Sequence, residues 1–209
     1  LRTPNYNSIF LKLNTKRVFE KQRKSKQDSK TVKPMNIALE AKRFFESGTG
    51  FGTYSRTLVG DLATFAPQNN YLLHAPNSEQ SLSISSMAHS AEIYRVMSHR
   101  CVKVIYPPHR GKLYWRTFGA RKSLQDNQID IYHGLTQQIP RSIRFSKVPK
   151  ILSIQDLIYR KYPDLFPGED LKSLDKQMRK ACRISDHIVS ISESTKRDLI
   201  QSFGINPSK

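Results

Sequence analysis

The sequence predicts an α/β protein built on a Rossmann-like, doubly wound parallel sheet. From Met35 onward, short β-rich runs alternate with helical patterns. A glycine-rich turn over residues 48–52 follows the first of these runs, and polar residues follow several of the later ones. Ligands of such sheets bind beyond the carboxyl ends of the strands, so these features indicate a binding crevice at that edge.

Six short apolar runs have the length and composition of strands, at residues 36–41, 71–75, 102–106, 129–133, 150–154 and 187–191. Helical spacing of apolar residues predicts helices at 51–65, 112–125, 170–184 and 193–203. The first of these helices carries Tyr54, Leu58 and Leu62 on one face, and Gly204 ends the last. The Ser-rich residues 77–90 predict a loop or a weak helix.

Charge divides the chain at Met35. Residues 1–34 hold ten Lys/Arg and two acidic residues, and we expect a basic, disordered extension there, followed by one domain over residues 35–209. The net charge of +18 favours anionic partners such as phosphates, an anionic membrane face or nucleic acid. Residues 204–209 have the composition of a linker, so we expect a fragment of a longer protein that lacks a C-terminal domain.

No run of about 18 apolar residues occurs, so no transmembrane helix is expected. Cys101 and Cys182 lie far apart without metal-ligand spacing. They are expected to be buried or half-buried thiols in a reducing compartment.

The glycine-rich turn contains Gly48, Gly50, Phe51 and Gly52, and a helix begins nearby. Backbone N–H groups at a helix N-terminus bind phosphate, and glycine permits both close approach and positive φ. The alternative is an ordinary turn between a strand and a helix.

Polar residues at the other strand ends also have structural alternatives. His133 can be a hydrogen-bonded structural residue, and Asp156 can cap a loop or helix. Ser192 and Glu193 are best explained as the N-cap and first-turn acid of a helix.

Four segments together resemble the N-terminal domain of glycosyltransferase family 4, whose members have the GT-B fold: residues 48–54, 131–135, 153–157 and 186–199. The resemblance implies two Rossmann-like domains, with the acceptor bound mainly by the N-terminal one. It assigns the nucleotide-sugar donor to the C-terminal domain. It also implies transfer with retention of configuration and no metal ion or other cofactor.

The resemblance implies a role for each strand end. The donor phosphates would lie at the turn of Gly48, Gly50, Phe51 and Gly52. The positions facing the acceptor or sugar would be Tyr54, Gly134, Ser192 and Glu193. The residues assigned to the chemistry are Gln155, Asp156 and His133. Gln155 stands where the family often has His, and because Gln does not titrate near neutral pH, only a positioning role remains for it.

The basic, aromatic stretch over residues 109–122 suits an anionic lipid surface, and its interfacial residues are Arg110, Lys112, Trp115, Arg116 and Lys122. The alternative is a surface helix that packs its aromatic residues inward.

The predicted function is the acceptor side of a retaining glycosyltransferase that transfers sugar from a nucleotide-sugar donor to a glycan or lipid-linked acceptor. Cell-envelope polysaccharide synthesis in the cytoplasm, at the inner face of the membrane, is the expected setting, and the fragment alone is expected to be inactive. The alternative is a non-catalytic basic module that binds an anionic membrane or nucleic acid. The chain lacks RNA-recognition signatures, which argues against nucleic acid.

Overall fold

The computed structural model describes residues 33–75, 90–107 and 119–209. The chain separates into two units, Leu1–Pro34 and Met35–Lys209, and the second is described below. The predictions for residues 1–32, for residues 76–89 and for most of the basic aromatic stretch lie outside the described residues.

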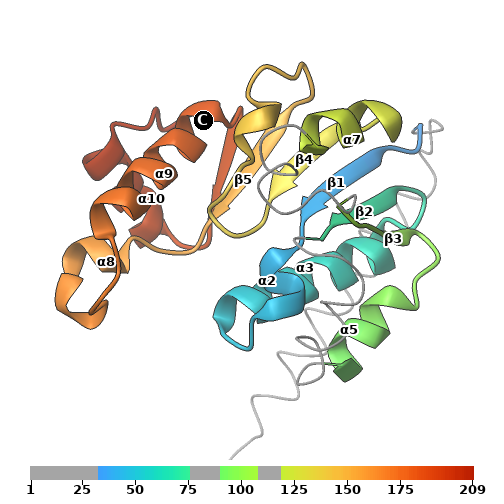
Figure 1. Ribbon diagram of the computed structural model, residues 1–209, viewed down its shortest axis with the longest axis horizontal. Coiled ribbons are helices and arrows are strands. Elements are labelled where there is room, and N and C mark those ends of the chain that lie inside the picture. The colour runs from blue at the N-terminus through green and yellow to red at the C-terminus, as the bar shows by residue number, and fades with distance from the viewer. Residues whose placement is uncertain (1–32, 76–89, 108–118) are drawn as a thin grey trace, which may run out of the picture. The chain divides into compact units, whose positions relative to one another are not determined.

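The second unit is built on a sheet of six parallel strands (Figure 1). The strands are β1 (Asn36–Glu40), β2 (Asn70–His74), β3 (Val102–Ile105), β4 (Ile131–Gly134), β5 (Lys150–Ile154) and β6 (His187–Ser190). Their spatial order is β3-β2-β1-β4-β5-β6, which is that of a Rossmann-like fold and confirms the predicted fold class. The strand order reverses between β1 and β4, and a crevice forms at such a switch point.

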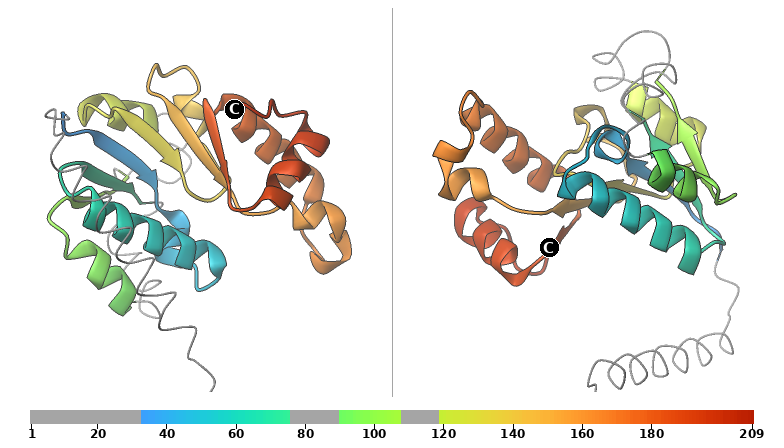
Figure 2. Two further views of the ribbon diagram at one scale, coloured as in Figure 1. Left: turned by 180° about the vertical axis from the view of Figure 1, so that it is seen from behind. Right: turned by 90° about the horizontal axis from the view of Figure 1, so that it is seen from below.

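Helices cover both faces of the sheet. The α-helices are α2 (Lys42–Glu46), α3 (Gly50–Phe65), α5 (Ser90–Met97), α7 (Ala120–Asp126), α8 (Ile158–Lys161), α9 (Leu171–Ile184) and α10 (Glu193–Phe203). Two short 3₁₀ helices are η3 (Arg141–Ile143) and η4 (Pro163–Leu165). The views from behind and below show α3 running along the sheet and α8, α9 and α10 grouped at the β6 end (Figure 2).

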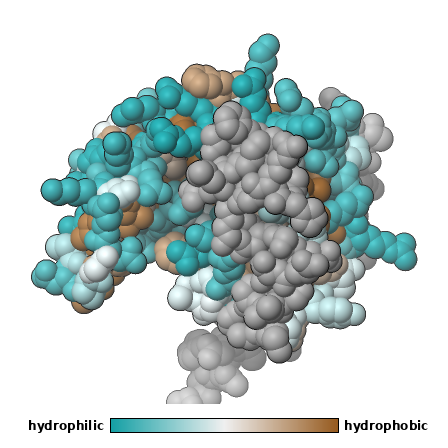
Figure 3. Space-filling view, viewed as in Figure 1, coloured by the Kyte–Doolittle hydropathy of each residue, from teal (hydrophilic) through white to brown (hydrophobic). Residues whose placement is uncertain are grey.

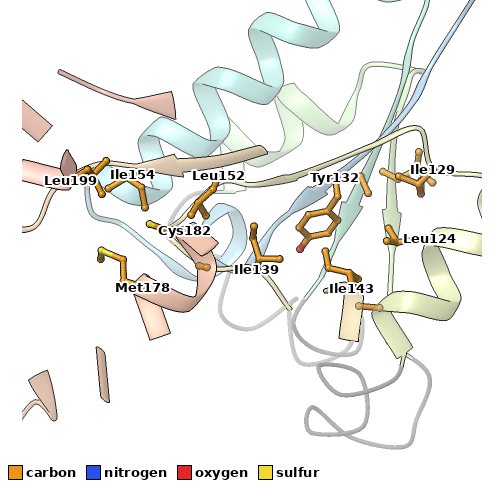
Figure 4. Packing of buried hydrophobic residues seen from close by; sticks show 14 of the residues in the cluster. Leu124, Ile129, Tyr132, Ile139, Ile143, Leu152, Ile154, Met178, Cys182 and Leu199 are labelled. Atoms are coloured by element: carbon orange, nitrogen blue, oxygen red, sulfur yellow. The ribbon is translucent and has the colours of Figure 1, made fainter. Parts of the chain in front are cut away.

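Two apolar cores correspond to the two faces. One packs side chains of α2, α3 and α5 against β1, β2 and β3, with Phe44, Val59 and Leu73 among its buried members. The other packs α7, η3, α9 and α10 against β4 and β5. Figure 4 shows this second core, with Ile139 and Ile143 near Tyr132. Burial of apolar surface on both faces, at roughly 25 cal/mol per Å², holds the layers together.

The six predicted strands are confirmed to within two residues at their ends, but three helices were missed. The expected direct passage from β1 into the glycine-rich turn is wrong, because α2 intervenes and buries Phe44 and Phe45. The helices α5 and α8 were also not predicted. Segments of four to eight residues contain too few turns for helical periodicity to show.

The buried face of α3 differs from the predicted one. Tyr54, Leu58 and Leu62 are only half-buried. The buried residues of the helix are Gly52, Ser55, Arg56, Val59 and Ala63. This face includes the polar residues Ser55 and Arg56, so the spacing of apolar residues alone did not identify it.

Arg56 is the charged residue on that buried face, with a side chain only 4% exposed. Its Nη1 donates to the carbonyl oxygens of Phe44 at 3.0 Å and Ser47 at 2.9 Å, and its Nε donates to Glu92 on α5. The guanidinium therefore ties α2 and the following turn to α3 and α5, and satisfies carbonyls at the end of a helix.

The remaining sequence predictions for this unit concern the helix caps and the cysteines. Ser192 caps α10 and Gly204 ends it with a φ of 63°, as predicted. Cys101 is half-buried and Cys182 buried, both as free thiols, and burial raises the pKa of Cys182 to about 11. Within the described residues, no helix is long and apolar enough to cross a membrane.

We expect Arg56→Met to lower the free energy of unfolding by about 2 to 4 kcal/mol, because two carbonyls and the Glu92 carboxylate lose their buried donor. Glu92→Gln should cost less than about 1 kcal/mol, since Glu92 is 51% exposed and the amide still accepts. Urea denaturation followed by circular dichroism measures both. Equal losses in the two variants would contradict this account of Arg56.

Candidate functional site

The carboxyl ends of β1, β4 and β5 bring polar side chains together. β1 ends at Glu40, β4 continues into Thr136, and β5 continues into Gln155. The first turn of α10 joins this edge, because Thr195 Oγ1 donates to the Gln155 carbonyl oxygen at 2.9 Å. Four elements distant in sequence thus contribute to one edge of the sheet.

Ser153 on β5 is the centre of a hydrogen-bonded cluster. Its Oγ lies 2.8 Å from Tyr54 Oη on α3 and 2.8 Å from His133 Nε2 on β4. The Ser153 residue is fully buried. Two predicted site residues, Tyr54 and His133, are therefore connected through a hydroxyl that the sequence analysis gave no role of its own.

Burial lowers the pKa of His133 to about 4, so the imidazole is neutral at pH 7. A neutral ring with an unprotonated Nε2 accepts from Ser153, which leaves Ser153 Oγ free to accept from Tyr54. With this tautomer, Tyr54 Oη donates to Ser153 Oγ, and Ser153 Oγ donates to His133 Nε2. His133 holds the orientation of Tyr54 in this arrangement.

Gln155 is buried directly after β5, with 7% of its surface exposed. Its Nε2 donates to the Leu135 carbonyl oxygen at 2.9 Å, which connects it to the segment after β4. Its Oε1 is buried and has no hydrogen-bond partner among the described residues. An unpaired buried acceptor costs about 1 to 3 kcal/mol. The amide is therefore held by its donor end while its acceptor end is unused.

Asp156 and Ser192 have local capping roles. Asp156 Oδ1 accepts from the Ile158 N–H at 3.1 Å, at the start of α8. Ser192 Oγ accepts from the Thr195 N–H at 3.1 Å, and Glu193 is the acid in the first turn of α10. Ser192 and Glu193 are exposed, whereas Asp156 is half-buried.

Hydrogen bonds between Ser47 and Thr49 stabilise the start of the glycine-rich turn. Ser47 Oγ lies 2.7 Å from Thr49 Oγ1 and accepts from the Thr49 N–H at 3.2 Å. Thr49 is the N-cap residue of α3, and Gly50 is its first residue. None of the described residues accepts from the N–H of Gly50 or Phe51, as is usual in the first turn of a helix.

The turn needs glycine for a reason other than the one expected. The described glycines with positive φ are Gly168 and Gly204, so the expectation of positive φ within the turn is wrong. A Cβ on Gly52 would lie 1.9 Å from the Ser47 carbonyl oxygen, whereas one on Gly50 would meet nothing within 4 Å. Gly134 is constrained in the same way, since its Cβ would lie 2.3 Å from the Gln138 carbonyl oxygen.

Residues 71–209 match the family described as Glycosyltransferase Family 4, which is more than half of the 209 residues. The chain belongs to glycosyltransferase family 4. No curated protein and no solved structure matches the chain. The family match includes His133, Ser153 and Gln155 and begins after the glycine-rich turn.

Glu40, the last residue of β1, was not selected from the sequence. Its Oε2 accepts from Thr136 Oγ1 at 2.6 Å and its Oε1 accepts from the Lys42 N–H at 2.8 Å. Burial raises the pKa of Glu40, although both hydrogen bonds favour the charged form. The expectation that ligands bind at the carboxyl ends of the strands would have selected Glu40 if the last residue of each strand had been considered.

Of the predicted membrane residues, Lys122 lies in the described part of the chain. Arg110, Lys112, Trp115 and Arg116 lie outside the described residues. Lys122 is exposed on α7, and the predicted start of that helix at residue 112 lies outside the described residues.

From the packing of the glycine-rich turn, we expect alanine substitutions at Gly52 and Gly50 to have opposite effects on stability. Gly52→Ala should destabilise the fold by about 1 to 3 kcal/mol, because the methyl group meets a backbone carbonyl. Gly50→Ala should be neutral or stabilising by up to about 1 kcal/mol, since it adds a helix former in open space. Thermal unfolding of both proteins tests the pair, and a Gly52→Ala variant as stable as Gly50→Ala would refute the packing argument.

The lowered pKa of the half-buried His133 leads us to expect a pH dependence of stability. Its folded-state pKa of about 4 lies below the ordinary value of 6.5, so its contribution is present above pH 6.5 and is lost as the pH falls toward 4. His133→Gln should flatten this part of the profile by about 1 to 2 kcal/mol while keeping an acceptor for Ser153.

Urea denaturation between pH 4 and 7.5 provides the measurement. The matched control is His187→Gln, at an exposed position on β6, which should leave the wild-type slope unchanged. A slope that is the same in all three proteins would show that burial of His133 does not contribute.

Proposed function

We propose that this domain is the acceptor side of a retaining glycosyltransferase, which transfers a sugar from a nucleotide-sugar donor to a glycan or lipid-linked acceptor. The nucleotide sugar is a substrate, and no metal ion or other cofactor takes part. The donor is held mainly by a second Rossmann-like domain that faces the carboxyl edge of the sheet, so residues 1–209 alone transfer no sugar.

The arrangement of Tyr54, Ser153 and His133 beside Gln155 supports this proposal most. Sugar recognition requires hydroxyl and amide groups with fixed orientations, because a saccharide presents many hydroxyls of similar chemistry. Tyr54 is oriented by Ser153, and Ser153 is oriented by a neutral imidazole. His133 lies on β4, next to the switch point, and Ser153 lies on the neighbouring strand β5. Open α/β sheets bind ligands at such a point.

Gln155 positions the transferred sugar or the acceptor. Its Nε2 is occupied by the Leu135 carbonyl, so its role rests on the unused Oε1, which accepts a hydrogen bond from a hydroxyl after a small local rearrangement. Asp156 supports this position through its backbone, since its carbonyl oxygen accepts from Gln137 Nε2 at 3.3 Å.

The start of α3 assists departure of the nucleotide diphosphate. The N–H groups of Gly50 and Phe51 and the positive end of a 16-residue helix favour the negative charge that develops on the leaving group. Gly50 has open space around its Cα, which permits close approach of a phosphate.

The proposed setting is the cytoplasm, at the inner face of a membrane, in the synthesis of cell-envelope polysaccharide. The high net positive charge supports peripheral contact with an anionic membrane surface.

Substitutions at Gln155, in the enzyme that contains this domain, test the proposal. Gln155→Ala should lower kcat/KM about tenfold to hundredfold, which corresponds to about 1 to 3 kcal/mol for a lost hydrogen bond. Gln155→His should lose less, since imidazole also makes hydrogen bonds. Neither change should remove a limb of the pH–rate profile between pH 5 and 9, because Gln does not titrate there.

The matched control is Gln201→Ala, at an exposed position on α10, which should keep wild-type kinetics. Transfer is followed with radiolabelled nucleotide sugars over that pH range. A Gln155→Ala variant as fast as wild type would defeat the positioning role, and turnover by residues 1–209 alone would defeat the need for a second domain.

A further inference from the structure

A groove of about 610 Å³ lies between α9 and the segment that follows β4. One wall is a stripe of α9 that includes Lys176, Gln177 and Lys180, at the spacing of one helix face. The other wall contains Gln137, Gln138 and Arg141. Over α9 the surface is mainly hydrophilic, with small apolar patches (Figure 3).

The charged side chains of the groove are all basic, and the apolar side chains of Ile139, Ala181 and Ile184 complete its lining. Arg141, Lys176 and Lys180 line it, and Arg144 and Arg183 lie close enough to act on Lys180 electrostatically. None of these five cations forms an ion pair with a described acidic residue. The nearby carboxylate on α9, Asp175, is already bound by Arg160 and Arg179.

This accumulation of charge is unfavourable in the absence of an anion. Lys176 and Lys180 are four residues apart on one helix face, about 6 Å along its axis, where like charges repel. Partial burial, together with the positive charges of the four neighbouring cations, lowers the pKa of Lys180. A bound anion with more than one negative charge would relieve the repulsion of several cations at once.

The chemistry of the lining selects among anions. Arginine and lysine side chains together with amide N–H donors match the tetrahedral oxygens of phosphate, which carries up to two charges as a monoester and more as a diphosphate. A single carboxylate would satisfy one arginine and leave the two lysines unpaired. We propose that the groove between α9 and residues 137–141 binds a phosphate or diphosphate group, either free or at the end of a lipid or glycan chain.

The groove leads toward the candidate site through Gln137. This residue lines the groove, its N–H donates to the Ser153 carbonyl oxygen at 3.1 Å, and its Nε2 donates to the Asp156 carbonyl oxygen. A molecule anchored by its phosphate in the groove would extend toward Gln155 with its other end. That last step rests on the proposed function, whereas phosphate binding in the groove does not.

Binding to the full 209-residue chain tests the inference without any transfer assay. Inorganic pyrophosphate is titrated by calorimetry, and vesicles carrying phosphatidic acid are tested by co-sedimentation, so the two sources of phosphate are separated. The groove variant is Lys176→Glu with Lys180→Glu. The matched control, Lys172→Glu with Arg197→Glu, changes the net charge equally at exposed positions that do not line the groove.

We expect the groove variant to bind pyrophosphate at least tenfold more weakly than wild type, with the control within twofold of wild type. Selective loss of vesicle binding alone would also support the site and identify a lipid-borne phosphate as its source. Equal weakening in both variants would mean general electrostatic attraction and would overturn the inference, as would a wild type that binds neither probe. Unfolding temperatures of both variants confirm that they fold.

Discussion

The hydrogen bonds of one buried guanidinium organise the amino-terminal half of this domain. Arg56 reaches from α3 to two carbonyl oxygens of α2 and its following turn, and its other side meets Glu92 on α5. The Ser47 carbonyl oxygen, which lies close to Gly52, accepts a hydrogen bond from the Arg56 guanidinium. Replacing Arg56 by an apolar residue would remove this donor. The shape of the turn therefore depends on a charge inside the protein and not on glycine flexibility.

A second set of polar contacts joins the two halves at the carboxyl edge of the sheet. Ser153 connects α3 with β4, Glu40 connects β1 with Thr136, and Thr195 connects α10 with Gln155. The apolar cores hold the layers, whereas these bonds determine how the side chains at the edge are oriented. The arrangement of hydroxyl and amide groups at this edge therefore depends on both sets of contacts.

Much of the fold was predictable from the sequence because strands can be recognised from short local patterns. Apolar runs ended by turn residues located all six strands, and the Ser192 and Gly204 caps located α10. The helix α2 was not predicted because five residues are too few to show a helical period. The burial of Arg56 was not predicted because an arginine does not indicate a buried helix face. The family resemblance was also visible locally, since its motifs are short and follow the strands.

The site was predictable in position but not in detail. His133 and Gln155 were selected near strand ends and Tyr54 beside the glycine-rich turn, and hydrogen bonds join Tyr54 and His133 through Ser153 on β5. Ser153 as their centre depends on a contact between residues 99 positions apart, which no local pattern contains. The role of Gly52 likewise depends on where the Ser47 carbonyl comes to lie in the folded chain.

The backbone of Gln137 restricts how this region varies in sequence. Its φ of 64° belongs to the left-handed region, which glycine adopts without strain and asparagine adopts more readily than most other residues. Glycine would relieve the strain but lose the amide that donates to the Asp156 carbonyl, and asparagine is one methylene shorter. Conformation and side-chain reach thus demand different residues at position 137. A substitution at this position therefore gives up either the relaxed backbone conformation or the contact between the loop after β4 and the loop after β5.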